Sequence, residues 1–483
     1  MFYRALLLTA VNLALRLVGT GFQVYLSRRI GPEGIGLLQL TLSVGSMATI
    51  MGIGGIRTAT MYLTAEALGR RHPGRIPWIL SGCLRYSLVC SLAVGTGLYL
   101  LSPILARQWI GSPAIAPALT LFACFLPTTC LCAVMSGYFT GENRIGTLAG
   151  VEILEQFFSM AVTIAVLALW VGHSAVRACR AVIFGSAMGS CLSLLLLWRL
   201  YRRTRPAAGA PLAVAGRITR AAVPLAIADT AKSGISTLEN LMVPKRLAYF
   251  SATPLAEFGI ITGMVFPVLM FPACILFGLS ELLIPEMARA GAAGADRRIR
   301  YLLHKALRAA LLYSTFFCGI LYLSAPELCD RLYQNQQAGL YLRLYAPLIP
   351  MLYCDAIVDA MTKGLGQQTM AVKLNILTNS LDVALLFFLL PKWGMKGYFI
   401  SFLITHALNF TLSIRHLLRT AGEHLSLRPI AASLGCCAGA VWVCRRFEAG
   451  TAAYCLLFLC LMYLTGSIRR QDLLWLKGLV TQK

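Results

Sequence analysis

Three arginines lie inside the first three hydrophobic spans of the chain, at similar distances from a basic helix end. Arg16, Arg57 and Arg85 are each about seven to twelve residues from that end, which is roughly 10–18 Å at 1.5 Å per residue. A charge at that depth costs at least about 2.5–3.5 kcal/mol on insertion scales, so it seldom faces lipid. Three charges of one sign in one layer therefore predict a water-filled cavity that receives an anion.

Arginine suits such a site, because its planar guanidinium grips the oxygens of a diphosphate in pairs and stays charged at any working pH. The alternative is a purely structural ion-pair network, in which the three arginines pair with Glu152 and Glu155 of the fifth span. Three cations against two carboxylates leave one charge unbalanced. The residues alone leave both interpretations open.

Acidic side chains occupy the second predicted lobe, residues 218–416, at a comparable depth. Asp229, Asp355 and Asp382 lie roughly 15–20 Å from the cytoplasmic ends of their spans. Carboxylates with neighbouring amide oxygens are the ligands that Na⁺ or H⁺ coupling requires, so the three aspartates are candidate ion-coupling residues. Internal salt bridges are the alternative, since Lys232 stands one turn from Asp229.

The composition is that of an all-α polytopic membrane protein. The chain is 58% hydrophobic and 13% charged over 483 residues, and its apolar runs are too long for a soluble core. Lysine and arginine outnumber aspartate and glutamate by 43 to 19, but cytoplasmic loops explain this excess without nucleic acid. The first apolar stretch carries Arg16 and has no small-residue cleavage site, so we do not expect a cleavable signal peptide.

No pattern in the sequence predicts an enzyme. The sixteen cysteines are scattered, mostly inside apolar spans, and none forms a C-x-x-C pair, which favours free buried thiols over a metal site. P-loop, H-E-x-x-H and G-x-S-x-G motifs are missing from the sequence. We therefore assign no catalytic residue, no metal ligand and no cofactor, apart from the coupling ion.

Hydropathy divides the chain into fourteen spans. With both termini cytoplasmic, the inner segments hold about 26 lysines and arginines and the outer segments about 13, as the positive-inside rule requires. The expected spans are 4–27, 35–64, 78–104, 115–140, 147–172, 180–200, 218–243, 256–288, 302–324, 342–365, 369–391, 396–415, 427–445 and 450–468.

A weak internal repeat suggests how these spans are grouped. Short motifs recur at offsets of roughly 217–227 residues, consistent with two six-helix repeats that point the same way around a central site. The predicted domains are an N-terminal lobe over 1–200, a cytoplasmic linker over 201–217, a C-terminal lobe over 218–416, two additional helices over 427–468 and a cytoplasmic tail over 469–483.

Several stretches in this order resemble a known transporter superfamily. They are LSRRIGPEGIGL at 26–37, GGI at 54–56, VPKRL at 243–247 and the interrupted FG, GM, FP and LIPE between 258 and 286. The chain resembles the multidrug/oligosaccharidyl-lipid/polysaccharide exporter superfamily, and within it the polysaccharide biosynthesis proteins and the stage V sporulation protein B and MurJ-type lipid flippases. The resemblance implies that Arg16 and Arg57 bind a lipid diphosphate, whereas Arg85 is added from its depth alone. It further implies a sodium site in the second lobe and a lipid-tail groove on the two additional helices.

The expected function is a flippase or exporter in the cytoplasmic membrane. It would move a lipid-linked anionic oligosaccharide or peptidoglycan precursor, held by the arginines, as two lobes rock about the cavity. Its expected partners are this polyprenyl-diphosphate substrate, membrane lipids and cell-envelope synthesis proteins, and no nucleic acid. Two alternatives stay open: a multidrug–cation antiporter of the same superfamily, and a non-transporting membrane scaffold for envelope or spore-cortex synthesis.

Overall fold

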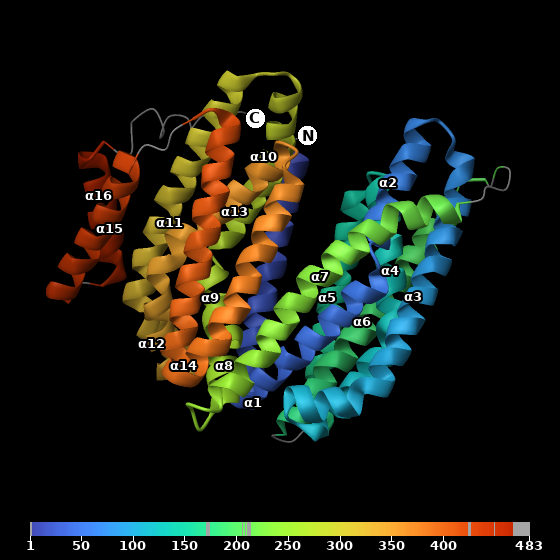
Figure 1. Ribbon diagram of the computed structural model, residues 1–483, viewed down its shortest axis with the longest axis horizontal. Coiled ribbons are helices and arrows are strands. Elements are labelled where there is room, and N and C mark those ends of the chain that lie inside the picture. Colours follow the sequence, from blue (N-terminus) through green and yellow to red (C-terminus); the bar gives the residue numbers. More distant parts are fainter. Residues whose placement is uncertain are drawn as a thin grey trace. The chain divides into compact units, whose positions relative to one another are not determined.

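Every regular element in the described part of the chain is a helix. The computed structural model describes residues 2–170, 174–204, 206, 207, 209, 214–423, 427–448 and 450–466 (Figure 1). Helices are the expected solution for a chain this apolar, because a helix satisfies its backbone hydrogen bonds within one segment. The prediction of an all-helical fold is confirmed.

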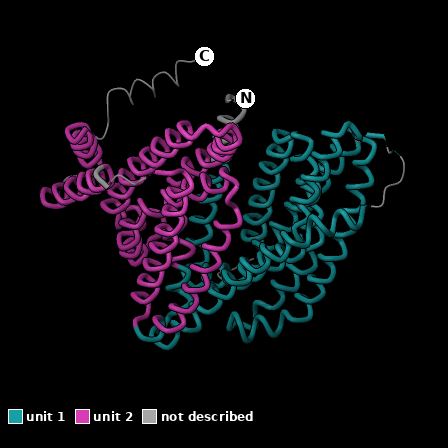
Figure 2. The backbone as a smooth tube through the Cα atoms, turned by 45° about the horizontal axis from the view of Figure 1, so that its top comes forward, with its two compact units in different colours: residues 1–259, 390–392 teal, residues 260–389, 393–483 magenta. Residues whose placement is uncertain are grey.

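The chain forms two compact units (Figure 2). Unit 1 contains residues 1–259 with 390–392, and unit 2 contains residues 260–389 with 393–483. This division lies later in the sequence than the predicted linker at 201–217, because the helix that follows the linker packs within unit 1. The two six-helix lobes stay a prediction.

Unit 1 is a bundle of helices, several of which pack against multiple neighbours. Its elements are α1 (Phe2–Ile53), α2 (Ile56–Gly69), η1 (Pro73–Arg75), α3 (Ile76–Ile104), η2 (Leu105–Ile110), η3 (Pro113–Ile115), α4 (Ala116–Gly141), α5 (Ile145–Trp170), α6 (Ala175–Thr204), α7 (Ala215–Leu247) and most of α8 (Pro254–Ile260).

Helix α1 is too long to cross a bilayer once. Its 52 residues would extend roughly 78 Å, more than twice the hydrocarbon thickness of about 30 Å. Gly31 breaks the helix with φ 72° and ψ 176°, and Pro32 restarts it. Only glycine adopts such angles readily, so the loop expected between the first two spans is reduced to a one-residue turn.

A second break separates α1 from α2. Gly54 and Gly55 both have positive φ, of 53° and 69°, and the next helix begins at Ile56. A Cβ on Gly55 would lie 2.5 Å from the carbonyl oxygen of Ala222, so glycine also permits the close approach of α7. The Tyr86 hydroxyl of α3 donates to the Gly54 carbonyl at 3.3 Å. The break is therefore fixed from two neighbouring helices.

The core of unit 1 surrounds this break. Ile56, Cys83, Tyr138 and Ala222, from α2, α3, α4 and α7, are all fully buried within one hydrophobic cluster. Because protein interiors are close-packed, such a cluster holds the first turn of α2 in one orientation.

Unit 2 contains the remaining helices. They are η4 (Ile261–Val265), α9 (Phe266–Met270), α10 (Ala273–Ala292), α11 (Asp296–Tyr333), α12 (Gln336–Tyr345), η5 (Ala346–Leu348), α13 (Ile349–Gly364), α14 (Gln368–Ala421), α15 (Leu427–Arg446) and α16 (Thr451–Leu464). Helix α14, like α1, is interrupted by one non-helical glycine. Gly394, with φ 55° and ψ −135°, divides its 54 residues into two antiparallel arms.

Helices α15 and α16 pack against α11 (Figure 1). The ring of Tyr454 lies directly on Gly319, where a Cβ would overlap it. The Tyr454 hydroxyl donates to the carbonyl oxygen of Thr315 at 3.2 Å. This hydrogen bond satisfies the one polar atom of a fully buried side chain, so the contact between the helix pair and α11 is specific.

The described helices support a membrane protein with many crossings. Eight of them are long and apolar enough to span a bilayer, or nine if the pair Pro254–Met270 and Ala273–Ala292, bent by 63°, is one span. Dividing α1 and α14 at their glycines would raise this number, but fourteen crossings and two cytoplasmic termini stay predictions. The predicted tail at 469–483 and part of the predicted linker lie outside the described residues.

Candidate functional site

Arg57 occupies the first turn of α2, immediately after the double-glycine break. The N-terminus of a helix carries a partial positive charge and backbone N–H groups that can receive an anion. A discontinuous helix whose N-terminus lies within a membrane span is a common way for transporters to bind an anionic group. Arg57 and the α2 N-terminus therefore favour the same type of ligand.

Helix α5 lies near both α2, at Arg57, and α1, at the residue before Arg16. Arg57 interacts electrostatically with Glu152. One turn further along α5, the Gln156 side chain donates to the backbone carbonyl of Leu15 at 3.1 Å, next to Arg16. Residues four apart share a helix face, so one face of α5 lies near Arg57, through Glu152, and against the α1 backbone at Leu15, through Gln156.

The two carboxylates at this turn of α5 have different partners. Glu155, the second acid, accepts a hydrogen bond from the Ser190 hydroxyl of α6 at 3.3 Å, which gives that carboxylate a partner of its own. The side chains of Arg16 and Arg57 are both exposed. Two exposed cations and a helix N-terminus beside Glu152 form a candidate anion site, which we call the α5 site.

Arg85 lies elsewhere on unit 1. Its side chain is exposed on the face of α3 that also carries Leu88 and Leu92, which are 41% and 51% exposed. The opposite face of α3, with Cys83 and Ser87, is buried against other helices. The described contacts thus bring Arg16 and Arg57 to one helix but do not place Arg85 with them, and a shared cavity for all three stays a prediction.

A buried polar network in unit 2 contains Asp382. This residue is only 8% exposed, and its Oδ1 accepts hydrogen bonds from Ser401 at 2.5 Å and Thr405 at 3.1 Å. The carboxylate stands on the first arm of α14 and both hydroxyls on the second. The turn at Gly394 therefore creates the site, because it folds the two arms against each other.

Asp355 of α13 joins the same network through an amide. Asn409 donates to Asp355 Oδ2 at 3.1 Å, and its own amide oxygen accepts from Thr378 at 3.3 Å. Thr378 stands one turn before Asp382. The other oxygen of Asp355, Oδ1, is buried and has no hydrogen-bond partner among the described residues. A buried carboxylate oxygen without a donor is costly unless a cation or proton reaches it.

The remaining acids of the candidate coupling set differ in their surroundings. Asp359, one turn after Asp355, is paired with Lys363 at 2.6 Å and is thereby neutralised. Asp229 lies on α7 in unit 1 with an exposed side chain. In the described ranges, no group of three or more His, Cys, Asp or Glu residues is placed to hold a metal ion. The network of Asp355 and Asp382 offers instead carboxylate, hydroxyl and amide oxygens.

Sequence reasoning selected the two aspartates but missed the residues that connect them. Ser401, Thr405 and Asn409 recur at intervals of four, so they form a polar stripe on one face of an apolar span. That spacing is a signal visible in the sequence. Thr378 and Asp382 form the matching pair on the opposite arm.

These features define a multi-pass protein of the cytoplasmic membrane. Its fold matches an inward-facing multidrug resistance MATE family transporter of the MOP superfamily, with a TM-score of 0.68, 14% identity, and coverage of 85% of this chain and 94% of that one. It also matches the lipid II flippase MurJ in an inward closed conformation, with a TM-score of 0.71, 11% identity, and coverage of 97% and 100%.

The family follows from the sequence match. The model of the family described as polysaccharide biosynthesis protein matches residues 4–248, about half of the chain. The chain belongs to the polysaccharide biosynthesis protein family. It is also 24% identical over 407 residues to stage V sporulation protein B of Bacillus subtilis (strain 168), covering 81% of this chain and 78% of that protein. The predicted family resemblance is confirmed.

Proposed function

We propose that this protein is a flippase or exporter that carries a lipid-linked, anionic sugar intermediate across the cytoplasmic membrane. The cargo class is a polyprenyl-diphosphate oligosaccharide or peptidoglycan precursor. Transport proceeds by alternating access, with the diphosphate held in the N-terminal half of the chain.

One observation carries the proposal: Arg57 begins a helix in mid-span and lies near Glu152, on the face of α5 whose Gln156 contacts the α1 backbone next to Arg16. A diphosphate is the ligand that benefits from both features. Its oxygens accept paired hydrogen bonds from a guanidinium, and its charge is stabilised by the helix N-terminus. Glu152 attracts Arg57 in the absence of cargo, and a bound diphosphate would compete with that carboxylate for the arginine's charge.

The relatives support the cargo class by what their names state. One is a sporulation protein, one is named a lipid II flippase, and the family is named for polysaccharide biosynthesis. The multidrug transporters with the same fold receive other substrates, so the fold alone does not decide between them.

The coupling ion in this proposal is Na⁺ or H⁺, bound at the network of Asp355 and Asp382. Occupation of the network would stabilise one arrangement of the two arms of α14 over another. A ligand shifts a conformational equilibrium only by its difference in affinity between the two states. The unpaired Oδ1 of Asp355 is the position where such a difference would arise.

The experiment that tests the cargo is flipping of a head-group-labelled polyprenyl-diphosphate sugar by purified protein in liposomes. Arg57→Ala removes a charge-assisted contact worth about 1.5–3 kcal/mol, so affinity should fall roughly ten- to over a hundredfold. Arg57→Lys should restore part of it, because an ammonium keeps the charge and loses the fork. Arg177→Ala, an exposed arginine at the start of α6, is the matched control.

The same assay separates the alternatives. Equal flipping by wild type, Arg57→Ala and Arg57→Lys would contradict the proposal. Export of a lipophilic cation in preference to the labelled lipid would favour the multidrug antiporter. The non-transporting scaffold would be favoured by two results together. The protein would transport neither compound, and its Arg57→Ala variant would still rescue a strain that lacks its stage V sporulation protein B.

A further inference from the structure

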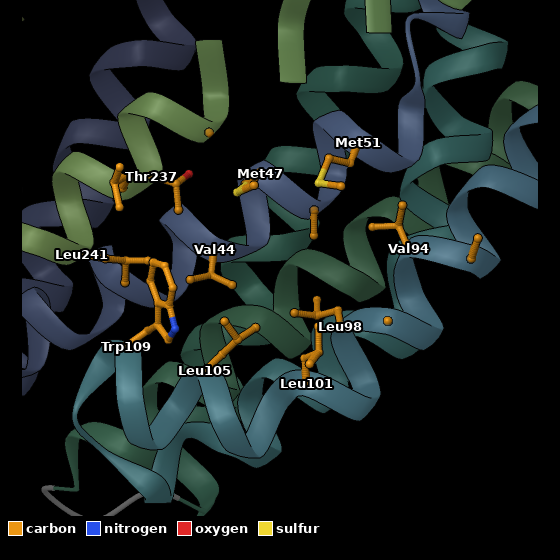
Figure 3. Close-up of a pocket in the computed structure, with 15 residues that line it drawn as sticks. Val44, Met47, Met51, Val94, Leu98, Leu101, Leu105, Trp109, Thr237 and Leu241 are labelled. Atoms are coloured by element: carbon orange, nitrogen blue, oxygen red, sulfur yellow. The ribbon is translucent and has the colours of Figure 1, made fainter. Parts of the chain in front are cut away.

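Unit 1 contains an apolar pocket that the α5 site does not use. Its volume is about 700 Å³, within the range of ligand sites in proteins, and it is lined by α1, α3, η2 and α7 (Figure 3). Met47, Met51, Leu98, Leu101 and Trp109 point into it from three of these elements.

Apart from the indole N–H of Trp109, the side chains that line the pocket offer no free hydrogen-bonding group to a polar ligand. The pocket's one hydroxyl, on Thr237 of α7, donates to the backbone carbonyl of Ser43 in α1 at 3.2 Å. An apolar site of this kind gives water few partners, whereas a hydrocarbon fits it. The flexible side chains of Met47 and Met51 also adapt their shape to an irregular chain.

Small residues create the space. Gly97 of α3 and Gly234 of α7 both line the pocket. A Cβ on Gly97 would meet no atom within 4 Å, and one on Gly234 would meet only the end of the Met47 side chain at 3.8 Å. The pocket is also open to its surroundings, because Leu101 and Leu238 on its wall are 50% and 43% exposed.

The charge beside the pocket is positive. The ammonium of Lys245, near the end of α7, lies 5.6 Å from the centre of the Trp109 ring. A cation–π contact of this kind occupies the ring face that a lipophilic cation would otherwise use, and the two cations would repel each other. The pocket therefore fits the hydrocarbon part of a neutral or anionic molecule.

The position of the pocket along α1 relates it to the α5 site. Its α1 residues, Val44 to Met51, lie in the last turns of α1 before the double-glycine break, and Arg57 lies in the first turn of α2 just after that break. A cationic site followed by an apolar one matches a molecule with an anionic head and a hydrocarbon chain. We propose that this pocket binds a segment of the polyprenyl chain of the lipid-linked cargo while the diphosphate lies at the α5 site.

This inference rests on the proposed function, and it predicts selectivity more than affinity. Lipid tails are as apolar as leucine, so moving a chain from the bilayer into the pocket gains no hydrophobic free energy. The gain comes from packing against a shaped wall. A branched isoprenoid chain should therefore be preferred over a straight acyl chain, which the bilayer supplies in excess.

The test is photolabelling of the full-length protein in lipid nanodiscs. The probe is undecaprenyl diphosphate with a diazirine in its chain, and labelled peptides are mapped by mass spectrometry. We expect label in the pocket segments of α1, α3 and α7. Gly97→Phe and, independently, Gly234→Phe should reduce it about tenfold, which corresponds to roughly 1.4 kcal/mol of binding free energy. Gly216→Phe, at an equally open position outside the pocket, should not.

Two further measurements separate the chain from the head. Inorganic diphosphate should bind equally to wild type and Gly97→Phe but more weakly to Arg57→Ala. The proposal that the pocket binds the polyprenyl chain is overturned if both phenylalanine variants leave the labelling unchanged. It is also overturned if a diazirine phosphatidylglycerol labels the pocket equally well. If Arg57→Ala binds inorganic diphosphate as tightly as wild type, the proposed function is overturned instead. In that case, chain labelling that Gly97→Phe and Gly234→Phe reduce still supports the pocket.

Discussion

Replacing Asp382 with asparagine tests the coupling network directly. The substitution keeps the shape of the side chain and an oxygen that accepts from Ser401 and Thr405, so both hydroxyls retain a partner. What changes is the charge. The variant should therefore fold and reach the membrane while it loses its cation affinity.

The size of the expected loss in cation affinity follows from the surroundings of the Asp382 carboxylate. A cation 4 Å from a unit negative charge gains about 4 kcal/mol at an effective dielectric constant of 20, which is roughly a thousandfold in affinity. Because Asp382 is only 8% exposed, water screens this interaction little. The matched control is Asp359→Asn. Its carboxylate is about one-third exposed and paired with Lys363, so its loss should cost at most about 1 kcal/mol.

The assay measures how Na⁺, and separately pH, changes the melting temperature and the flipping rate of the purified protein. A ligand present at one hundred times its Kd stabilises the folded state by about 2.7 kcal/mol, so the wild type should show a clear ion-dependent shift. Asp382→Asn should show none at the same concentration, and Asp359→Asn should resemble wild type. If Asp382→Asn keeps the full dependence on both ions, the network is structural and the coupling proposal is refuted.

Three further substitutions test the architecture. Gly55→Ala should destabilise the protein by about 1–3 kcal/mol, seen as a lower melting temperature, because φ is positive and a carbonyl of α7 lies 2.5 Å from the new Cβ. Gly319→Leu should displace Tyr454 and make α15 and α16 more sensitive to limited proteolysis, and an unchanged digestion pattern would contradict this packing. Glu66→Gln should alter the melting temperature only slightly, because Arg217, its partner at 2.6 Å, is partly exposed and such pairs contribute at most about 1 kcal/mol.

The helices themselves were predictable, because the period and length of apolar runs depend on each segment alone. Their ends were less so. The expected interval between 27 and 35 is instead one non-helical residue, Gly31, because glycine followed by proline turns the chain without a loop. The expected span 35–64 is divided at Gly54 and Gly55, whose positive φ angles become necessary only when α7 packs against them.

The depth of a buried charge can be read from the sequence, but its direction cannot. Arg16, Arg57 and Arg85 have similar depths, and the cost of burial applies to each of them equally. Their orientations depend on which face of the helix meets a neighbour. Arg85 shares its face with exposed leucines, whereas Arg57 lies beside α5, and only the packing of unit 1 distinguishes the two.

The aspartates of unit 2 also show that sequence locates a charged residue but does not reveal its neighbours. Asp355 and Asp382 are conspicuous in the sequence because each is an acid within an apolar span. The polar residues that join them are ordinary until the turn at Gly394 brings the two arms of α14 together. An apolar pocket is harder still to predict, because its lining has no charge to mark it and its space arises from small residues on separate helices. Sequence therefore indicates where a membrane protein carries an energetic cost, and the packing of its helices determines whether that cost becomes a binding site.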